Sequence, residues 1–283
     1  MNCCSFPLVS VIITTYNRES LLPRAINSIL SQTYKNFEVI VVDDCSTDNT
    51  TKTVKDIGSD KLIYVKNDKN IGLAASRNVG IRHSKGEFIS FLDDDDEILP
   101  TKIEKQVNLF KDESLGAVYC GSVRLHNGCS LFSMPKYRGN ILKYALKYPI
   151  NTIHSLLIRR SCILEVGMFD ENLFSYEDWD LWVKLAMKYQ IDYVDECLAI
   201  YNIHGEQMTF DLAKKIEHHI VVFQKYYDKI SSYSGLLHWH DRKLLSRCLL
   251  AGKYDDAFEY ILKSIKSNPL DPVSYIHFLL FFI

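Results

Sequence analysis

The sequence lacks several features that would place it in common classes of protein. Its 283 residues include 33 lysines and arginines and 35 aspartates and glutamates, mixed along the chain, so the formal net charge is only -2. Because no overall positive field would attract a polyanion, we expect no nucleic-acid partner. No apolar run reaches the ~18 residues that a membrane-spanning helix needs.

Signals for secretion and for zinc binding are also missing. The N-terminus lacks a basic stretch followed by an apolar one, and residues 7–15 read instead as a β-strand. The eight cysteines form no Cys-x-x-Cys pair, and several lie in apolar runs as small hydrophobic residues would. The histidines at positions 218, 219, 238 and 240 have no partners at zinc-site spacing, which favours structural or surface roles. These features predict reduced thiols and a cytoplasmic protein.

The chain has no Gly-x-x-x-x-Gly-Lys-Ser/Thr motif, which excludes P-loop chemistry. What it does contain is a regular alternation of apolar runs, at residues 8–14, 37–42, 62–65 and 88–92, with amphipathic helical patterns. This alternation predicts βαβ units, and therefore an α/β fold with a mostly parallel, Rossmann-like sheet flanked by helices.

The second half of the chain has a looser pattern. Residues 121–136 are rich in turn formers and read as a loop, whereas residues 177–189 read as a helix. From about Thr209 the chain reads as helical, and residues 244–269 resemble one tetratricopeptide-type hairpin. Because fewer than three such units rarely fold alone, we expect these helices to pack on the α/β domain. The apolar tail, residues 275–283, could dock on the protein, a partner or a membrane surface, and docking on the protein is favoured.

Four consecutive aspartates, Asp93 to Asp96, directly follow the apolar run at residues 88–92. These like charges would repel one another without a bound cation, and oxygen-rich clusters bind hard divalent ions. The carboxyl ends of parallel strands meet at the sheet edge where α/β proteins bind ligands. The sequence therefore predicts a metal site here, rather than a solvated acidic turn.

Two further strand ends carry polar and aromatic residues. The first strand ends in Thr14-Thr15-Tyr16-Asn17 and the second in Val42-Asp43-Asp44-Cys45, which neighbouring strands would bring side by side. A tyrosine ring can stack on a base, and a carboxylate can accept a hydrogen bond from a ring N–H. Together they predict a nucleobase pocket, although Tyr16 alone could be packing and Asp44 alone a turn or helix cap.

Five segments of the chain match the sequence motifs of one enzyme family, in the same order. They read VSVIITTYN at 9–17, VVDDCSTDNT at 41–50, NIGLAASRNVGI at 70–81, GEFISFLDDDD at 86–96 and YEDWDLW at 176–182. In this order they resemble the inverting glycosyltransferases of family 2, which have the nucleotide-diphospho-sugar-binding GT-A fold. The resemblance covers residues 7–205. It implies a GT-A catalytic domain at residues 1–207, followed by a helical extension at residues 208–283.

Carried over by position, the resemblance implies that Thr14, Tyr16 and Asp44 hold the nucleobase of a nucleotide-sugar donor. It also implies that Asp94 contacts the ribose. A stacking tyrosine beside a carboxylate favours uracil or thymine, and therefore a UDP- or dTDP-sugar.

Three acidic or imidazole side chains are implied as metal-binding. Within Asp93-x-Asp95, Asp95 would be the main ligand of Mn²⁺ or Mg²⁺ and Asp93 would support it. Such an ion would neutralise the departing nucleoside diphosphate without proton transfer. His204 matches a histidine on a loop that closes over the donor in related enzymes, and metal ligation, phosphate contact and loop structure all stay open for it. Asn202 departs from the commoner Tyr-Arg-x-His wording, which puts a phosphate contact at that position in doubt.

Asp178 matches the family's catalytic base. An inverting transfer is a single displacement, so one carboxylate must take the proton of the acceptor hydroxyl. The alternative is that the acids at 177, 178 and 180 only favour the positive end of a helix. Arg77 matches a basic residue near the base or the phosphates, and its alternative is a solvated helix arginine paired with an acid.

The expected activity is metal-dependent sugar transfer to a hydroxyl of a glycan or lipid-linked saccharide, in cell-surface polysaccharide synthesis. A peripheral contact with the inner face of the membrane is one interpretation of the apolar tail. A nucleotidyltransferase should have a glycine-rich basic loop after the first strand, which residues 14–17 lack. A non-catalytic sugar- or partner-binding protein on this fold would tolerate the loss of Asp95 and Asp178, yet both are present. The sequence predicts neither the acceptor nor the oligomeric state.

Overall fold

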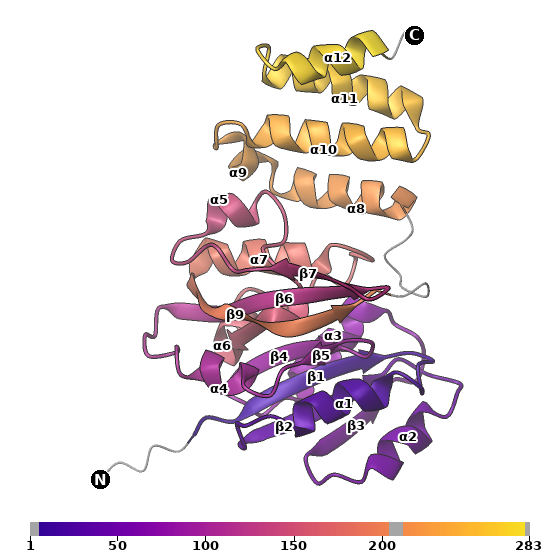
Figure 1. Cartoon of the computed structure of the whole chain (residues 1–283), viewed down its shortest axis with the longest axis vertical. Coiled ribbons are helices and arrows are strands. Elements are labelled where there is room, and N and C mark those ends of the chain that lie inside the picture. Colours follow the sequence, from indigo (N-terminus) through magenta and orange to yellow (C-terminus); the bar gives the residue numbers. More distant parts are fainter. Residues whose placement is uncertain (1–5, 204–211, 281–283) are drawn as a thin grey trace.

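A computed structural model of the chain describes residues 6–203 and 212–280 (Figure 1). The strands are β1 (Val9–Thr15), β2 (Phe37–Asp43), β3 (Leu62–Lys66), β4 (Phe88–Asp93), β5 (Glu97–Ile98), β6 (Leu115–His126), β7 (Cys129–Ser133), β8 (Leu156–Arg159) and β9 (Gln190–Asn202). Around them lie α1 (Leu22–Leu30), α2 (Thr50–Ile57), α3 (Leu73–His83), α4 (Lys102–Val107), α5 (Leu142–Ala145), the 3-10 turn η1 (Ile153–Ser155), α6 (Arg160–Glu165) and α7 (Glu177–Lys188). These elements alternate along the first hundred residues as the apolar periodicity predicts.

In the described part of the chain, nine strands form one sheet, in the order β3-β2-β1-β4-β8-β6-β9-β5, with β7 paired to β6. Strands β3, β2, β1 and β4 run parallel, which confirms the predicted α/β class. The central strand β1 pairs Thr14 with Val42 of β2 on one side and with Asp93 of β4 on the other. The carboxyl ends of these three strands therefore lie level at one edge of the sheet.

The sheet has an apolar cluster on each face, because side chains alternate along a strand. On β1, Val11 and Ile13 are buried in the cluster that contains the apolar face of α1. Ile12 between them belongs to the opposite cluster, with residues of α3 and α7. Helices packed on both faces of the sheet therefore hold in place the strand ends that carry the polar residues.

The expectation of a loop over residues 121–136 is wrong. Strand β6 continues to His126 and pairs antiparallel with β7. Asn127 and Gly128 join them, with φ angles of 48° and 78°, as a tight hairpin requires. The strand β9 has no counterpart among the predicted elements, because acids at positions 192, 195 and 196 interrupt its apolar pattern. It is held by parallel pairing with β6 and antiparallel pairing with β5.

Five helices follow in the described C-terminal residues. They are α8 (Leu212–Lys225), α9 (Tyr227–Ser231), α10 (Leu236–Leu250), α11 (Tyr254–Ser267) and α12 (Pro272–Leu280). The predicted hairpin is confirmed as α10 and α11, with Gly252 at φ 69° in the turn and Ala257 fully buried. Figure 1 shows this stack beside α7 and α5, away from β1, β2 and β3.

The helical stack is attached to the α/β part by buried polar contacts. The Tyr226 hydroxyl donates to Asp180 of α7 at 2.6 Å, and His240 Nε2 lies 3.0 Å from the carbonyl oxygen of Leu146. The proposed domain boundary at residue 207 lies outside the described residues.

The apolar end of the chain contributes one described helix. On α12, Phe278 packs with Phe258 of α11, their ring centroids 6.0 Å apart, whereas Leu279 is exposed. Residues 281–283 lie outside the described residues. No helix among those described is both long and apolar enough to span a bilayer.

Candidate active site

The level strand ends are flanked by unusual backbone geometry. Asn17 follows β1 with φ 52°, Cys45 follows β2 with φ 69°, and Tyr176 precedes α7 with φ 65°. Residues other than glycine rarely adopt this left-handed region, and such strain persists only where the surrounding structure holds it. The three positions mark the borders of one polar region that contains the predicted site residues.

Thr14, Tyr16 and Asp44 lie together at this edge. Thr14 is buried within β1, whereas the Tyr16 side chain is 46% exposed and its ring can accept a stacking partner. The Asp44 carboxylate accepts hydrogen bonds from the backbone N–H groups of Ile71 and Gly72, at 2.9 and 2.8 Å. The Asn67 side-chain amide also donates to Asp44 Oδ1, at 2.9 Å. Asp44 therefore fixes the loop before α3, and its Oδ2 keeps a lone pair for a further donor.

Asp94 and Asp95 share the guanidinium of Arg18. Arg18 Nη1 lies 3.4 Å from Asp94 Oδ1 and 2.5 Å from Asp95 Oδ2. Burial nevertheless raises the pKa of Asp94 to about 7. Arg18 is not among the residues predicted from the sequence, although it directly follows the first motif. The premise that only a bound cation could offset the aspartates is therefore wrong, because the protein supplies arginine.

Asp93 is held from the other side by Arg77. Arg77 Nη2 donates to Asp93 Oδ1 and Arg77 Nη1 to Glu177 Oε1, both at 2.7 Å. At 2% exposure, Arg77 is not the solvated helix arginine of the alternative, although it is paired with acids. Its position on α3 links the end of β4 to the start of α7.

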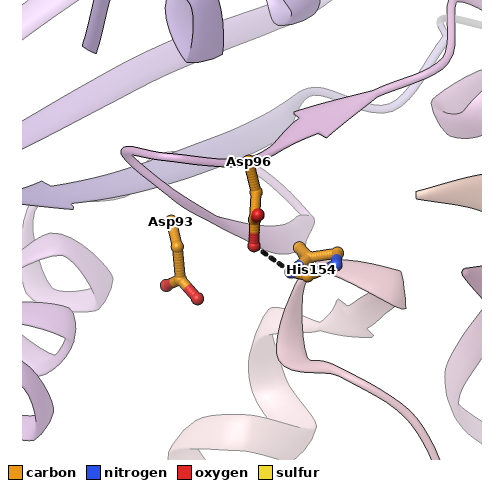
Figure 2. A group of neighbouring side chains, drawn as sticks. All are labelled: Asp93, Asp96 and His154. Atoms are coloured by element: carbon orange, nitrogen blue, oxygen red, sulfur yellow. Dashed lines mark ion pairs between the residues drawn. The ribbon is translucent and has the colours of Figure 1, made fainter. Parts of the chain in front are cut away.

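Asp96 pairs with a histidine that the sequence did not single out. Asp96 Oδ2 and His154 Nδ1 lie 3.1 Å apart, and both side chains are fully buried (Figure 2). Ligand atoms of Asp93, Asp96 and His154 all lie within 4.8 Å of one another, a spacing at which they could hold a metal ion. The two sets of candidate ligands, predicted and observed, have only Asp93 in common. His204, the third predicted ligand, lies outside the described residues.

Asn202, at the end of β9, binds two residues of the acidic loop. Its backbone N–H donates to Asp96 Oδ1 at 2.8 Å, and its side-chain amide donates to the Asp95 carbonyl oxygen at 2.9 Å. Asn202, which stands where the family motif commonly has arginine, therefore binds the acidic loop itself.

Asp178 lies on the wall of a cavity of about 890 Å³. Arg77, Asp93 and His154 line the same cavity from the sheet side, and residues of α8 and α10 close the opposite side. Burial and the neighbouring Glu177 carboxylate raise the pKa of Asp178 to about 7, against the opposing effect of Arg77. A carboxylate with a pKa near neutrality is suited to accept a proton.

Comparison with known proteins agrees with this arrangement. The model of glycosyl transferase family 2 matches residues 10–169. An uncharacterized glycosyltransferase of Rickettsia typhi is 34% identical over 241 residues, which cover 82% of this chain and 75% of that protein. The chain belongs to glycosyltransferase family 2. WcaA of Escherichia coli, named for colanic acid biosynthesis, is 30% identical to this glycosyltransferase over 81% of its length and 84% of WcaA.

Two solved structures share the GT-A fold with this glycosyltransferase. Residues 1–349 of Staphylococcus aureus TarS superpose with a TM-score of 0.69 at 20% identity, over 92% of this chain and 81% of that one. The mannosyltransferase PcManGT of Pyrobaculum calidifontis, solved with GDP-Man and Mn²⁺, gives a TM-score of 0.68 at 19% identity, over 96% and 79%. The predicted family, fold and enzyme class are thereby confirmed.

Proposed function

We propose that this enzyme transfers one sugar, with inversion, from a nucleotide-diphosphate donor to a hydroxyl of a glycan or lipid-linked saccharide. The observation that carries the proposal is Asp178, whose carboxylate faces a cavity of about 890 Å³ that also reaches Asp93. The proposed base, Asp178, and the acidic end of β4 thus line the same cavity. The similarity to WcaA supports a place in polysaccharide synthesis.

The donor would lie along the carboxyl ends of β1, β2 and β4. Tyr16 would stack on the base, Asp44 and Thr14 would bind its edge, and Asp94 would contact the ribose. TarS has been solved with UDP and with UDP-GlcNAc, and PcManGT with GDP-Man, so proteins of this fold hold such donors. The exposed Tyr16 ring beside the Asp44 carboxylate supports a pyrimidine, in a UDP- or dTDP-sugar.

A divalent ion would be held at the corner of the acidic loop, by Asp95 with Asp93 in support. The grouping of ligand atoms of Asp93, Asp96 and His154 within 4.8 Å supports an ion at this acidic loop. Carboxylates suit both Mg²⁺ and Mn²⁺, and an imidazole ligand such as the proposed His204 would favour Mn²⁺, because Mg²⁺ prefers oxygen ligands. When bound, the ion would offset charge on the leaving diphosphate. His204 remains a proposed third ligand.

The chain's own residues would move the proton and fix the geometry. As the acceptor oxygen forms its bond to the anomeric carbon and the carbon–phosphate oxygen bond breaks, Asp178 takes the hydroxyl proton. Arg77 positions the reaction centre by holding Asp93 and Glu177 at 2.7 Å each, one from the donor side and one beside the base.

A panel of nucleotide sugars, with and without Mn²⁺, tests the proposal by thermal unfolding. A ligand at 100 times its dissociation constant adds ~2.7 kcal/mol to the free energy of unfolding. We expect a Mn²⁺-dependent rise in melting temperature with one UDP- or dTDP-sugar, and little with the matching nucleoside monophosphate. If no nucleotide sugar raised the melting temperature, the proposal would be overturned in favour of a non-catalytic protein on this fold.

A further inference from the structure

The side of the cavity opposite the sheet carries three cations that have no acidic partner among residues 6–203 and 212–280. These residues, Lys215 on α8 and Lys243 and Arg247 on α10, line the cavity and define what we call the helix wall. Within the described ranges, no carboxylate lies within ion-pair distance of any of the three. By contrast, the buried cation on the sheet side, Arg77, has two carboxylate partners. Within the described residues, the helix wall therefore carries positive charge that no carboxylate pairs with.

Arg247 lies close enough to both lysines for their charges to repel. Burial, followed by the charge of Arg247, lowers the pKa of Lys215 and of Lys243. Arg247 is fixed in place, since its guanidinium contacts His219 Nδ1 and its carbon Cζ lies 5.3 Å from the centre of the Tyr176 ring. Proximity of like charges is unfavourable in the unliganded protein, and an anion bound between them would relieve it.

Two more cations reach the cavity from the α/β part and are held by aromatic rings. Lys147 Nζ lies 5.2 Å from the centre of the Trp239 ring, and Arg124 Cζ lies 5.9 Å from that of Tyr201. Both line the cavity. Cation–π contacts orient a cation without neutralising its charge, so they leave it available to a ligand.

Aromatic side chains accompany these cations. The rings of Tyr148 and Trp239 lie 5.9 Å apart and line the cavity, as does Phe174, which is 47% exposed. Such rings offer an apolar face on which a sugar ring can pack, with polar groups at its margin. Aromatic rings beside uncompensated cations suit a carbohydrate that carries negative charge.

We propose that the helix wall binds a phosphate group of the acceptor, so that the C-terminal helices select a phosphate-bearing sugar or polyol. The inference rests on the proposed function, because the same cavity leads to Asp178. Three cations that line one cavity suit a phosphate, which has more negative charge and more acceptor oxygens than a carboxylate. The donor diphosphate is a poorer candidate, since α8 and α10 stack beyond α7, away from β1 and β2 (Figure 1).

Isothermal titration with glycerol 3-phosphate, glucuronate and glucose tests the helix wall directly. We expect glycerol 3-phosphate to bind the wild-type enzyme more tightly than glucuronate, and glucose least. In the double variant Lys215→Gln/Lys243→Gln, its dissociation constant should rise at least ~tenfold, as expected for the loss of charge-assisted contacts. Lys266→Gln, which removes an exposed lysine of α11 outside the cavity, should change nothing. Circular dichroism verifies that each variant is folded.

The outcomes separate this inference from the proposed function, because nucleotide-sugar stabilisation is measured on the same variants. Tighter binding of glucuronate, or equal binding of glycerol 3-phosphate by wild-type and double-variant enzyme, would overturn the phosphate site. Loss of nucleotide-sugar stabilisation in the double variant would also overturn it, by assigning the cations to the donor. Wild-type phosphate binding that the double variant loses, with no response to any nucleotide sugar, would support the anion site and reject the transfer reaction.

Discussion

Charged side chains at the sheet edge and on the helix wall are balanced in opposite ways. At the sheet edge, Arg77 lies 2.7 Å from both Asp93 and Glu177, and Arg18 spans the next two aspartates. On the helix wall, Lys243 and Arg247 have no carboxylate partner in the described part of the chain. Paired charges fix the geometry of reacting groups, whereas unpaired charges keep their attraction for a ligand.

The difference also separates stability from binding. Removing one member of a buried ion pair leaves the other charge buried and uncompensated, which is strongly destabilising. Removing a partly exposed cation that is repelled by its neighbours leaves nothing unsatisfied. The same substitution, a cation replaced by glutamine, should therefore have different consequences in the two regions.

The largest effect should come from Asp178, the proposed base. We expect Asp178→Asn to lower the rate of donor turnover by ~10²–10⁴-fold, because the acceptor hydroxyl loses its proton acceptor. Nucleotide release measures the rate, and thermal unfolding verifies that the donor still binds. The matched control is Asp255→Asn, an exposed acid that also lies in the first turn of a helix. Unchanged turnover in Asp178→Asn would show that this carboxylate is not the base.

The next effect concerns the free energy of unfolding. We expect Arg77→Gln to lower it by ~3–5 kcal/mol, since Asp93 and Glu177 would face each other without a cation. Lys243→Gln, the control from the helix wall, should change it by less than ~0.5 kcal/mol. Chemical denaturation measures both. Equal losses would remove the distinction between the two regions.

The third prediction concerns the residues that would hold the divalent ion. The quantity measured is the Mn²⁺ concentration at which the donor gives half of its maximal stabilisation. We expect Asp95→Asn to raise it ~10–100-fold and His154→Gln to raise it less, because His154 orients Asp96 rather than holding the ion. Chelation of the metal should abolish the donor-dependent shift in both. The reverse ranking would place the ion between Asp93, Asp96 and His154, whose ligand atoms lie within 4.8 Å.

The smallest effect is on the pH dependence of turnover and of stability, which should change in opposite directions as the pH is lowered. Because Asp178 has a pKa of about 7, turnover should fall about fivefold from pH 7 to pH 6 and about fifteenfold from pH 7 to pH 5.5, as the base becomes protonated. The pKa of Asp94 is also raised to about 7, above its unfolded value of 3.8. Protonation of either carboxyl therefore favours the folded state, and this contribution is lost as pH rises through 7. Melting temperatures of Asp178→Asn should depend less on pH, and identical profiles would contradict the pKa assignment.

Much of the α/β part could be predicted from local pattern. The parallel strands and the helices between them follow from apolar periodicity, and the acids after β4 appear at a strand end in the sequence itself. The hairpin at Asn127-Gly128 also had a local signal, which the abundance of turn formers around it obscured. The strand β9 had none, because its acidic residues interrupt the alternation and its pairing partners, β5 and β6, are distant in sequence.

The sequence by itself determined the family, the parallel strands and the positions of Asp44, Asp93 and Asp178, since each depends on periodicity or on a short motif. Only the tertiary structure decided which cations face those acids and which face a cavity. Arg77 meets Glu177 and Asp96 meets His154 across long stretches of chain. Charge balance depends on distances in space, and those are set by how the sheet and the C-terminal helices pack, not by spacing along the chain.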